Sequence, residues 1–231
     1  INLENNPLVF QIVIAFILDL IIGDPYWFPH PVRGIGMLIK YGETALRKMR
    51  LTERLAGIFL LLSVVSIVYF ITSFVINYLA GFGKIFHIAA SIIVIYFTFS
   101  VRSLIKEAKK IVFLLESDDL NRARKELSNI VGRDTENMDR IQIKRACIES
   151  LAENMVDGII SPIFYAFIGG APFAMAYKAV NTLDSMVGYK NEKYLRLGWA
   201  SARFDDAANF LPARIARLII PAASFFCGAD P

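Results

Sequence analysis

Three carboxylates recur at helical spacing between Gly132 and Pro162, where a charged segment runs into an apolar one. If the chain is helical from about Ile141, then Glu149, Glu153 and Asp157 fall at i, i+4 and i+8 and share one face. Carboxylates on a common face suit proton transfer or the binding of Mg²⁺. A solvated acidic edge, in which Arg145 pairs with Glu149, accounts for the same spacing.

A second set of polar residues surrounds His30, in a segment that contains three prolines and therefore forbids regular helix. Asp24 and Arg33 lie close to His30 in the sequence. Such a group can bind an anion or transfer protons, whereas the alternative is a turn held by ordinary polar contacts. Because so much rigid backbone surrounds one titratable ring, we expect a functional role.

A third set occupies the segment from Lys178 to Asp206. Its acids and cations are mixed: Asp184, Glu192, Asp205 and Asp206 alternate with Lys178, Lys190 and Arg203. This mixture suits a phosphate site bridged by a metal ion, because Mg²⁺ prefers carboxylate oxygens while cations bind phosphate. A hydrophilic loop with incidental charges is the alternative.

Several kinds of chemistry are excluded by missing motifs. The sequence has no GxxxxGK[ST] phosphate loop, no HExxH and no GxSxG. Two histidines and two cysteines without a CxxC pair do not suggest a zinc site. The net charge of +4 comes from Lys and Arg beside apolar segments, which membrane orientation explains better than nucleic acid binding. Carboxylates with Lys and Arg remain, and these suit Mg²⁺-assisted handling of phosphates.

Long apolar segments must position these residues. Hydrophobic residues make up 55% of the chain, and the segments Leu55–Gly83 and Ile85–Val101 contain no Asp, Glu, Lys or Arg. Both are membrane spans by length. Pro7–Gly23 is expected to be a retained span, and Phe210–Phe226 a segment that spans at its outer end. We therefore predict an all-α polytopic membrane protein with four to five membrane segments, forming one domain over residues 1–231.

Charge placement predicts the orientation. The basic segment Gly34–Arg54 is expected on the cytoplasmic side. The third span is expected to continue as one helix into a cytoplasmic helical region over residues 102–157. Gly158–Tyr177 contains Pro162 and the run Gly169-Gly170-Ala-Pro172, which predicts a broken or re-entrant element and not a simple crossing. Such an element keeps the segment after Lys178 on the same side of the membrane as the helix that carries Glu149, Glu153 and Asp157.

Three long strings in the chain carry a family resemblance: GDPYWFPHPVRGIGMLI, the run from VGRDTENMDRIQIKRACIESLAENMVDGIISP through NTLDSMVGYKNEKY, and GWASARFDDAANFLPARI. In these strings the sequence closely resembles the CobD/CbiB family of adenosylcobinamide-phosphate synthases. The resemblance implies an integral membrane ligase that uses ATP and Mg²⁺ to join aminopropanol, or its O-phosphate, to adenosylcobyric acid. Chains of this family continue past Pro231 with a further polar motif, so we expect part of the active site to lie beyond this sequence.

Motif position and residue chemistry together assign roles to the polar residues. We expect catalysis by Glu149, Glu153, Asp157 and His30. Metal binding is assigned to Asp184, Asp205 and Asp206. The residues expected to bind substrate are Asp24, Arg33, Arg133, Asn154, Lys178, Asn181, Lys190 and Arg203.

The resemblance also implies partners and a location. The protein is expected in the cell membrane with its active site facing the cytoplasm, in contact with lipid, and as an oligomer or in association with other membrane enzymes of cobalamin assembly. Two other functions fit the residues. Acids and broken helices within a membrane also mark ion-coupled transporters. Asn181, Asp184, Asp205 and Asp206 loosely resemble the Mg²⁺-diphosphate motifs of membrane prenyl or phosphatidyl transferases, although the characteristic spacings are not matched.

Overall fold

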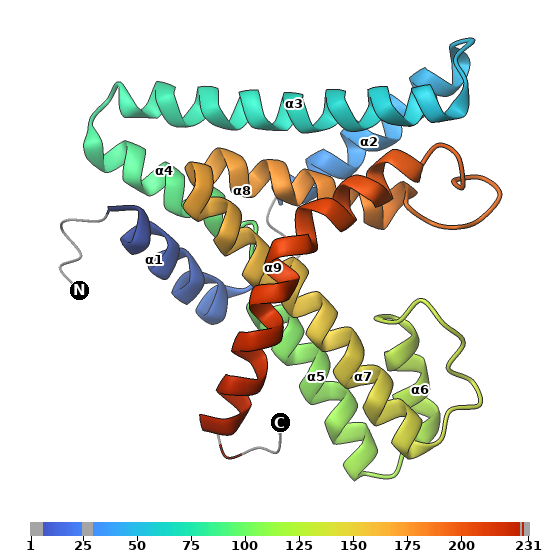
Figure 1. Ribbon diagram of the computed structural model, residues 1–231. Helices are drawn as coiled ribbons and strands as arrows, with labels where there is room; N and C mark the ends of the chain where they lie inside the picture. Colours follow the sequence, from blue (N-terminus) through green and yellow to red (C-terminus); the bar gives the residue numbers. More distant parts are fainter. Residues whose placement is uncertain (1–6, 25–29, 227, 229–231) are drawn as a thin grey trace.

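A computed structural model describes residues 7–24, 30–226 and 228, and these residues form helices without any strand (Figure 1). The all-α prediction is therefore confirmed. The helices are α1 (Pro7–Ile22), α2 (Pro31–Lys48), α3 (Glu53–Ala80), α4 (Lys84–Tyr96), α5 (Val101–Glu116), α6 (Leu120–Ser128), α7 (Arg140–Met155), the π-helical turn η2 (Val156–Ile160), α8 (Ser161–Val187) and α9 (Trp199–Phe226).

Three helical stretches are long and apolar enough to cross a membrane: Glu53–Ala80, Lys84–Glu116 and Arg140–Val187. The apolar helix α1 is shorter. At about 1.5 Å per residue, the 28 residues of α3 span roughly 42 Å, and large apolar side chains such as Phe59, Phe70 and Phe74 are exposed along it. These features agree with a polytopic membrane protein. The stretch Phe210–Phe226, predicted as a partial span, is the second half of α9, which does not meet the same criteria.

The helix that was predicted to run unbroken from the third span is interrupted between Tyr96 and Val101. Asp19 of α1 explains the break, because its Oδ2 accepts hydrogen bonds from the backbone N–H groups of Val101 at 2.6 Å and Arg102 at 3.3 Å. The buried carboxylate therefore caps the first turn of α5. Hydrophobic periodicity did not reveal this cap, because its acceptor lies about eighty residues earlier in the chain.

Helices α5, α6 and α7 form a unit with an apolar core of its own, which includes Ile111, Leu115, Leu127, Ile143 and Cys147. The larger core lies between α1, α2, α3, α4, α8 and α9. Figure 1 shows the smaller unit projecting from the rest of the molecule. The unit covers most of the predicted helical region 102–157, whose cytoplasmic location stays a prediction.

The predicted break in the segment after Gly158 is confirmed. Gly169 and Gly170 leave helical geometry, and Gly170 has φ of 69°, a value that residues with a side chain rarely adopt. The chain reverses there, so that α8 folds back on itself (Figure 1). The rings of Tyr165 and Tyr177 consequently stack at 5.0 Å. Residues before the reversal therefore lie close to residues after it.

Candidate functional site

Five carboxylates from four elements line one groove of about 470 Å³. Glu153 comes from α7, Asp157 from η2, Asp184 from α8, and Asp205 with Asp206 from α9. Two cations of α9, Arg214 and Arg217, line the same groove. We call this site the carboxylate groove. It contains every residue predicted to bind metal and two of the four predicted to be catalytic.

The reversal of α8 and the π-helical turn bring Asp157 into the groove. Asn181, on the returning arm of α8, donates its side-chain amide to Asp157 Oδ2 at 3.1 Å. The π-helical turn inserts extra backbone between α7 and α8, and such turns are frequent at functional sites. Gly158 in this turn accepts a hydrogen bond from Ser100 N at 3.1 Å, which ties the turn to the start of α5. Asp157 and Asn181 were both predicted site residues, and the structure joins them.

Asp205 is held by a hydrogen-bond network that the sequence did not predict. Asn209, one turn later on α9, donates its amide to Asp205 Oδ2 at 3.0 Å. The amide oxygen of Asn209 accepts hydrogen bonds from Ser161 Oγ at 2.6 Å and Tyr177 OH at 2.8 Å. These two donors define which end of the Asn209 amide faces Asp205. The orientation of the carboxylate is therefore set by both arms of α8.

The surroundings of Asp205 shift the pKa of its carboxyl group. Burial, and then the nearby carboxylates of Asp157 and Asp184, raise the pKa of Asp205 to about 7. Its Oδ1 atom is buried and has no hydrogen-bond partner among the described residues. An unpaired carboxylate oxygen surrounded by other carboxylates favours the binding of a cation.

The donor set of the groove fits Mg²⁺, a hard cation that takes carboxylate oxygens together with water. Asp184, Asp205 and Asp206 supply oxygens, and the unpartnered Asp205 Oδ1 is available as one of them. As the side chains stand, no three His, Cys, Asp or Glu residues of the described ranges converge on a single point. The residues that we expect to hold the metal are thus arranged around the groove and not closed into a cage.

A second pocket of about 320 Å³ collects the residues predicted near the first span. It is lined by Asp24, His30, Arg33, Ser100, Ser103 and Lys178, together with Val32 and Phe99. We call it the His30 pocket. Lys178 interacts electrostatically with Asp24 in this pocket and with Asp157 in the carboxylate groove. This lysine therefore links the two sites.

Both ring nitrogens of His30 are engaged. Nδ1 accepts the backbone N–H of Val32 at 3.2 Å and so caps α2, while Nε2 lies 3.1 Å from Asp24 Oδ1. Because Nδ1 is an acceptor, the proton resides on Nε2 and is donated to Asp24. Burial raises the pKa of Asp24, but the hydrogen bonds from His30 and Ser103 outweigh it and leave the pKa lowered. The geometry thus gives His30 a positioning role, whereas its predicted role in proton transfer remains untested.

Glu149 does not line the carboxylate groove that contains Glu153 and Asp157, and its catalytic role stays a prediction. Its carboxylate pairs with Arg133 at 2.5 Å, and both residues line a separate groove of about 500 Å³. Glu149 and Glu153 keep the predicted spacing of four residues within α7, whereas Asp157 lies in the π-helical turn that follows this helix. The loop before α7 supplies Arg133, the partner of Glu149.

Three further predicted residues lie outside both sites. Lys190 and Arg203 are exposed and line neither the carboxylate groove nor the His30 pocket. Asn154 is half-buried on α7 and donates its side-chain amide to Ser150 Oγ at 3.3 Å. Their predicted contact with substrate receives no support from these positions.

Five residues of the site were not predicted: Ser161, Tyr177, Asn209, Arg214 and Arg217. The spacing of four between Asp205 and Asn209 was a usable signal, because it places both side chains on one helical face. Arg214 and Arg217 were interpreted as part of a membrane segment. Ser161 and Tyr177 had no local signal, because their contact with Asn209 depends on how α9 crosses α8.

Comparison with known proteins places the chain in a family. A family model described as CobD/Cbib protein matches residues 12–229. Proteins named cobalamin biosynthesis protein CobD are similar over most of the chain. The protein from Clostridium tetani is 47% identical over 215 residues, covering 91% of this chain and 67% of its own. The protein from Leptospira interrogans (serovar copenhageni) is 46% identical over 222 residues, covering 94% of this chain and 69% of its own.

No solved structure matches the chain. The family model spans nearly all of it, and the matched residues include those of the carboxylate groove and of the His30 pocket. This protein therefore belongs to the CobD/CbiB family.

Proposed function

We propose that this protein acts in cobalamin biosynthesis, where it uses ATP to form the amide that joins aminopropanol, or its O-phosphate, to adenosylcobyric acid. Family membership supports the pathway, because the relatives carry the name cobalamin biosynthesis protein. The observation that carries the reaction type is the carboxylate groove, in which five acids from four elements meet Arg214 and Arg217. Acids that hold a metal beside cations that bind phosphate suit an ATP-dependent step.

Amide formation from a carboxylate and an amine has two requirements: activation of the carboxylate at the expense of ATP, and a base for the proton that the amine loses. Mg²⁺ bound by Asp184, Asp205 and Asp206 would neutralise phosphate charge. Arg214 and Arg217 would bind phosphate oxygens at the edge of the groove. Glu153 and Asp157 are the candidates for the base, since both line the groove and Asp157 is oriented by Asn181.

The His30 pocket is proposed to hold the amine substrate. Asp24 supplies a negative charge for an ammonium group, and Arg33 with Lys178 supplies positive charge for a phosphate if the amine carries one. Because Lys178 interacts with both Asp24 and Asp157, an amine in this pocket lies next to the groove where the carboxylate would be activated.

The test is turnover by purified protein supplied with adenosylcobyric acid, the amine with or without phosphate, ATP and Mg²⁺. We expect amidated corrinoid and consumption of ATP. The assay uses protein purified in detergent. Absence of product from such a protein, shown to be folded by its helical circular dichroism, would refute the proposal. Accumulation of corrinoid or ions in proteoliposomes without amide formation would instead establish the transporter alternative, which the broken helix α8 also fits.

The location of the site is part of the proposal. We place the carboxylate groove at the cytoplasmic side of the cell membrane, the side to which ATP has access. Cysteine labelling at the exposed residues Asn137 and Asn191, in a background without Cys147 and Cys227, tests this placement. Both positions should react with an impermeant reagent from the cytoplasmic side. Labelling from opposite sides would show that α8 crosses the membrane and does not return.

A further inference from the structure

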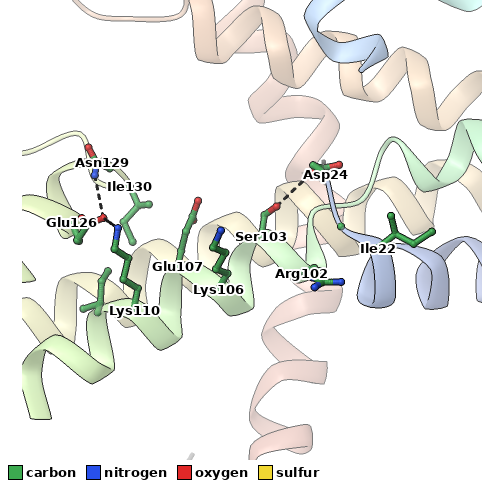
Figure 2. A pocket seen from close by; sticks show the side chains of 12 residues that line it. Ile22, Asp24, Arg102, Ser103, Lys106, Glu107, Lys110, Glu126, Asn129 and Ile130 are labelled. Atoms are coloured by element: carbon green, nitrogen blue, oxygen red, sulfur yellow. Dashed lines mark hydrogen bonds and ion pairs between the residues drawn. The ribbon is translucent and has the colours of Figure 1, made fainter. Parts of the chain in front are cut away.

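A fourth cavity, of about 480 Å³, lies between the end of α1 and helices α5 and α6 (Figure 2). We call it the α1–α5 cavity. Its apolar wall includes Ile22 at the end of α1 and Ile111 and Ile130 from the α5–α7 unit, so it lies where α1 meets that unit. It touches the His30 pocket only through Asp24 and Ser103, which line both. None of the residues of the carboxylate groove lines it.

Three cations enter this cavity from a single face of α5. Arg102, Lys106 and Lys110 follow one another at intervals of four residues, and all three line the cavity. Lys110 is already paired with Glu126 of α6 at 2.8 Å. Figure 2 shows this ion pair, whereas Arg102 and Lys106 form no ion pair with any described residue. Arg102 and Lys106 thus line the cavity without an ion-paired acid among the described residues.

Arg102 is held in place from two directions. Its backbone N–H is bound by Asp19, and its side chain packs over Gly23, which has φ of 66°. A Cβ atom at Gly23 would lie only 2.6 Å from Cδ of Arg102. Gly23 is itself anchored, because its carbonyl accepts a hydrogen bond from Tyr96 OH. The absence of a side chain at Gly23 therefore allows Arg102 to lie along this wall of the cavity.

Three acids line this cavity, as many as its three cations, but two of the acids have partners. Asp24 is engaged by His30 and Ser103, and Glu126 is neutralised by Lys110. Glu107 is then the one acid lining the cavity that has no partner among the described residues. Arg102 and Lys106 stand one helical turn apart on α5. Proteins use arginine and lysine to bind phosphate oxygens, the guanidinium through two parallel hydrogen bonds and the ammonium as a point charge.

We propose that the α1–α5 cavity binds a phosphate group through Arg102 and Lys106. Two sources carry this chemistry. One is the headgroup of an anionic phospholipid, since Ile22 ends an apolar helix at the cavity. The other is the phosphate of a soluble molecule. This proposal does not depend on the proposed amide synthesis, because it concerns a different cavity and is tested by binding.

Two binding experiments distinguish the sources. In detergent, inorganic phosphate and pyrophosphate are titrated by calorimetry. In nanodiscs that contain phosphatidylcholine and phosphatidylglycerol, the lipid retained by the protein is counted by native mass spectrometry. The variants are Arg102→Gln, Lys106→Gln and the charge-preserving Arg102→Lys. The matched control is Lys109→Gln, which removes the same charge from an exposed residue of α5 that does not line the cavity.

Wild type and Lys109→Gln should bind the same ligand, soluble phosphate or phosphatidylglycerol, with equal affinity. Arg102→Gln and Lys106→Gln should weaken that binding about ten-fold or more, and Arg102→Lys should weaken it less. The ligand that shows this pattern identifies the source. Equal binding by wild type and both glutamine variants, equal loss in Lys109→Gln, or no binding of either ligand by wild type would overturn the proposal. If Arg102→Gln does not fold, Lys106→Gln, altered at an exposed residue, still decides the outcome.

Discussion

Asn209 donates its side-chain amide to Asp205 at 3.0 Å, and its own oxygen is held by Ser161 and Tyr177. The amide cannot turn over without losing both of these hydrogen bonds. The two arms of α8 thus orient the carboxylate of Asp205 through a single residue of α9, Asn209.

Replacement of Asn209 by Leu should lower turnover by about ten-fold to a hundred-fold, because a hydrogen bond to a charged group contributes about 1.5–3 kcal/mol. Tyr177→Phe should have a smaller effect, since Ser161 still holds the amide. The measurement is kcat for the proposed amide-forming reaction, with Asn77→Leu on an exposed position of α3 as control. Unchanged kcat in Asn209→Leu would show that the orientation of Asp205 is not important for the reaction.

The stability of the protein should fall as pH rises from about 4 to about 7. An unfolded aspartate titrates near 4, whereas burial and the neighbouring carboxylates raise the pKa of Asp205 to about 7 in the folded protein. Between these values the folded state binds a proton that the unfolded state lacks, so deprotonation favours unfolding. One pKa unit corresponds to about 1.4 kcal/mol, which bounds the contribution at about 4 kcal/mol.

Denaturant unfolding at pH 5 and pH 8, in detergent with EDTA, measures this dependence. Asp205→Asn should lose less stability than wild type between the two values. The exposed Asp134→Asn serves as control and should follow wild type. If Asp205→Asn keeps the full pH dependence of the wild-type stability, the effect comes from other groups.

Mg²⁺ should stabilise the folded protein, because a cation relieves the repulsion among the acids of the groove. Binding of a ligand at 100 times its Kd stabilises the folded state by about 2.7 kcal/mol. Thermal unfolding with MgCl₂, compared with NaCl of equal ionic strength, is the measurement. Asp184→Asn and Asp205→Asn should abolish the shift, while Asp134→Asn should retain it. A shift that persists in both groove variants would place the metal elsewhere.

Glu149→Gln should leave turnover within about three-fold of wild type, in contrast to Asp184→Asn, which should lower it at least about a hundred-fold. Glu149 is paired with Arg133 in a different groove, and both side chains are largely exposed. Exposed pairs of this kind contribute at most about 1 kcal/mol. Comparable losses of turnover in the two variants would support a catalytic role for Glu149.

Gly170→Ala should destabilise the protein by about 1–3 kcal/mol, because the residue has φ of 69° at the reversal of α8. Gly169→Ala should also be destabilising, since a Cβ there would collide with the ring of Phe173. Gly132→Ala is the control, because a Cβ at Gly132 meets nothing within 4 Å. Measuring the free energy of unfolding in detergent checks the predicted order of stability among these variants. Equal stabilities would mean that the reversal does not depend on glycine.

The sequence by itself determined the elements of this protein and much of its acid chemistry. The uncharged run from Leu55 to Gly83 predicted α3, because only a helix satisfies its own backbone in hydrocarbon. The glycine pair at 169–170 predicted the break in α8. Asp157, Asp184 and Asp205 were selected by residue type, and all three line the groove.

Only the tertiary structure decided which of these side chains meet. Periodicity describes the neighbours along one helix, whereas contacts between helices depend on where the chain reverses and at what angle the helices cross. Glu149 and Asp157 therefore line different grooves, and the path of α9 brought Asn209, Arg214 and Arg217 to the acids. The cap that Asp19 provides for α5, and the fit of Arg102 over Gly23, likewise join residues about eighty positions apart. No local pattern records such pairs.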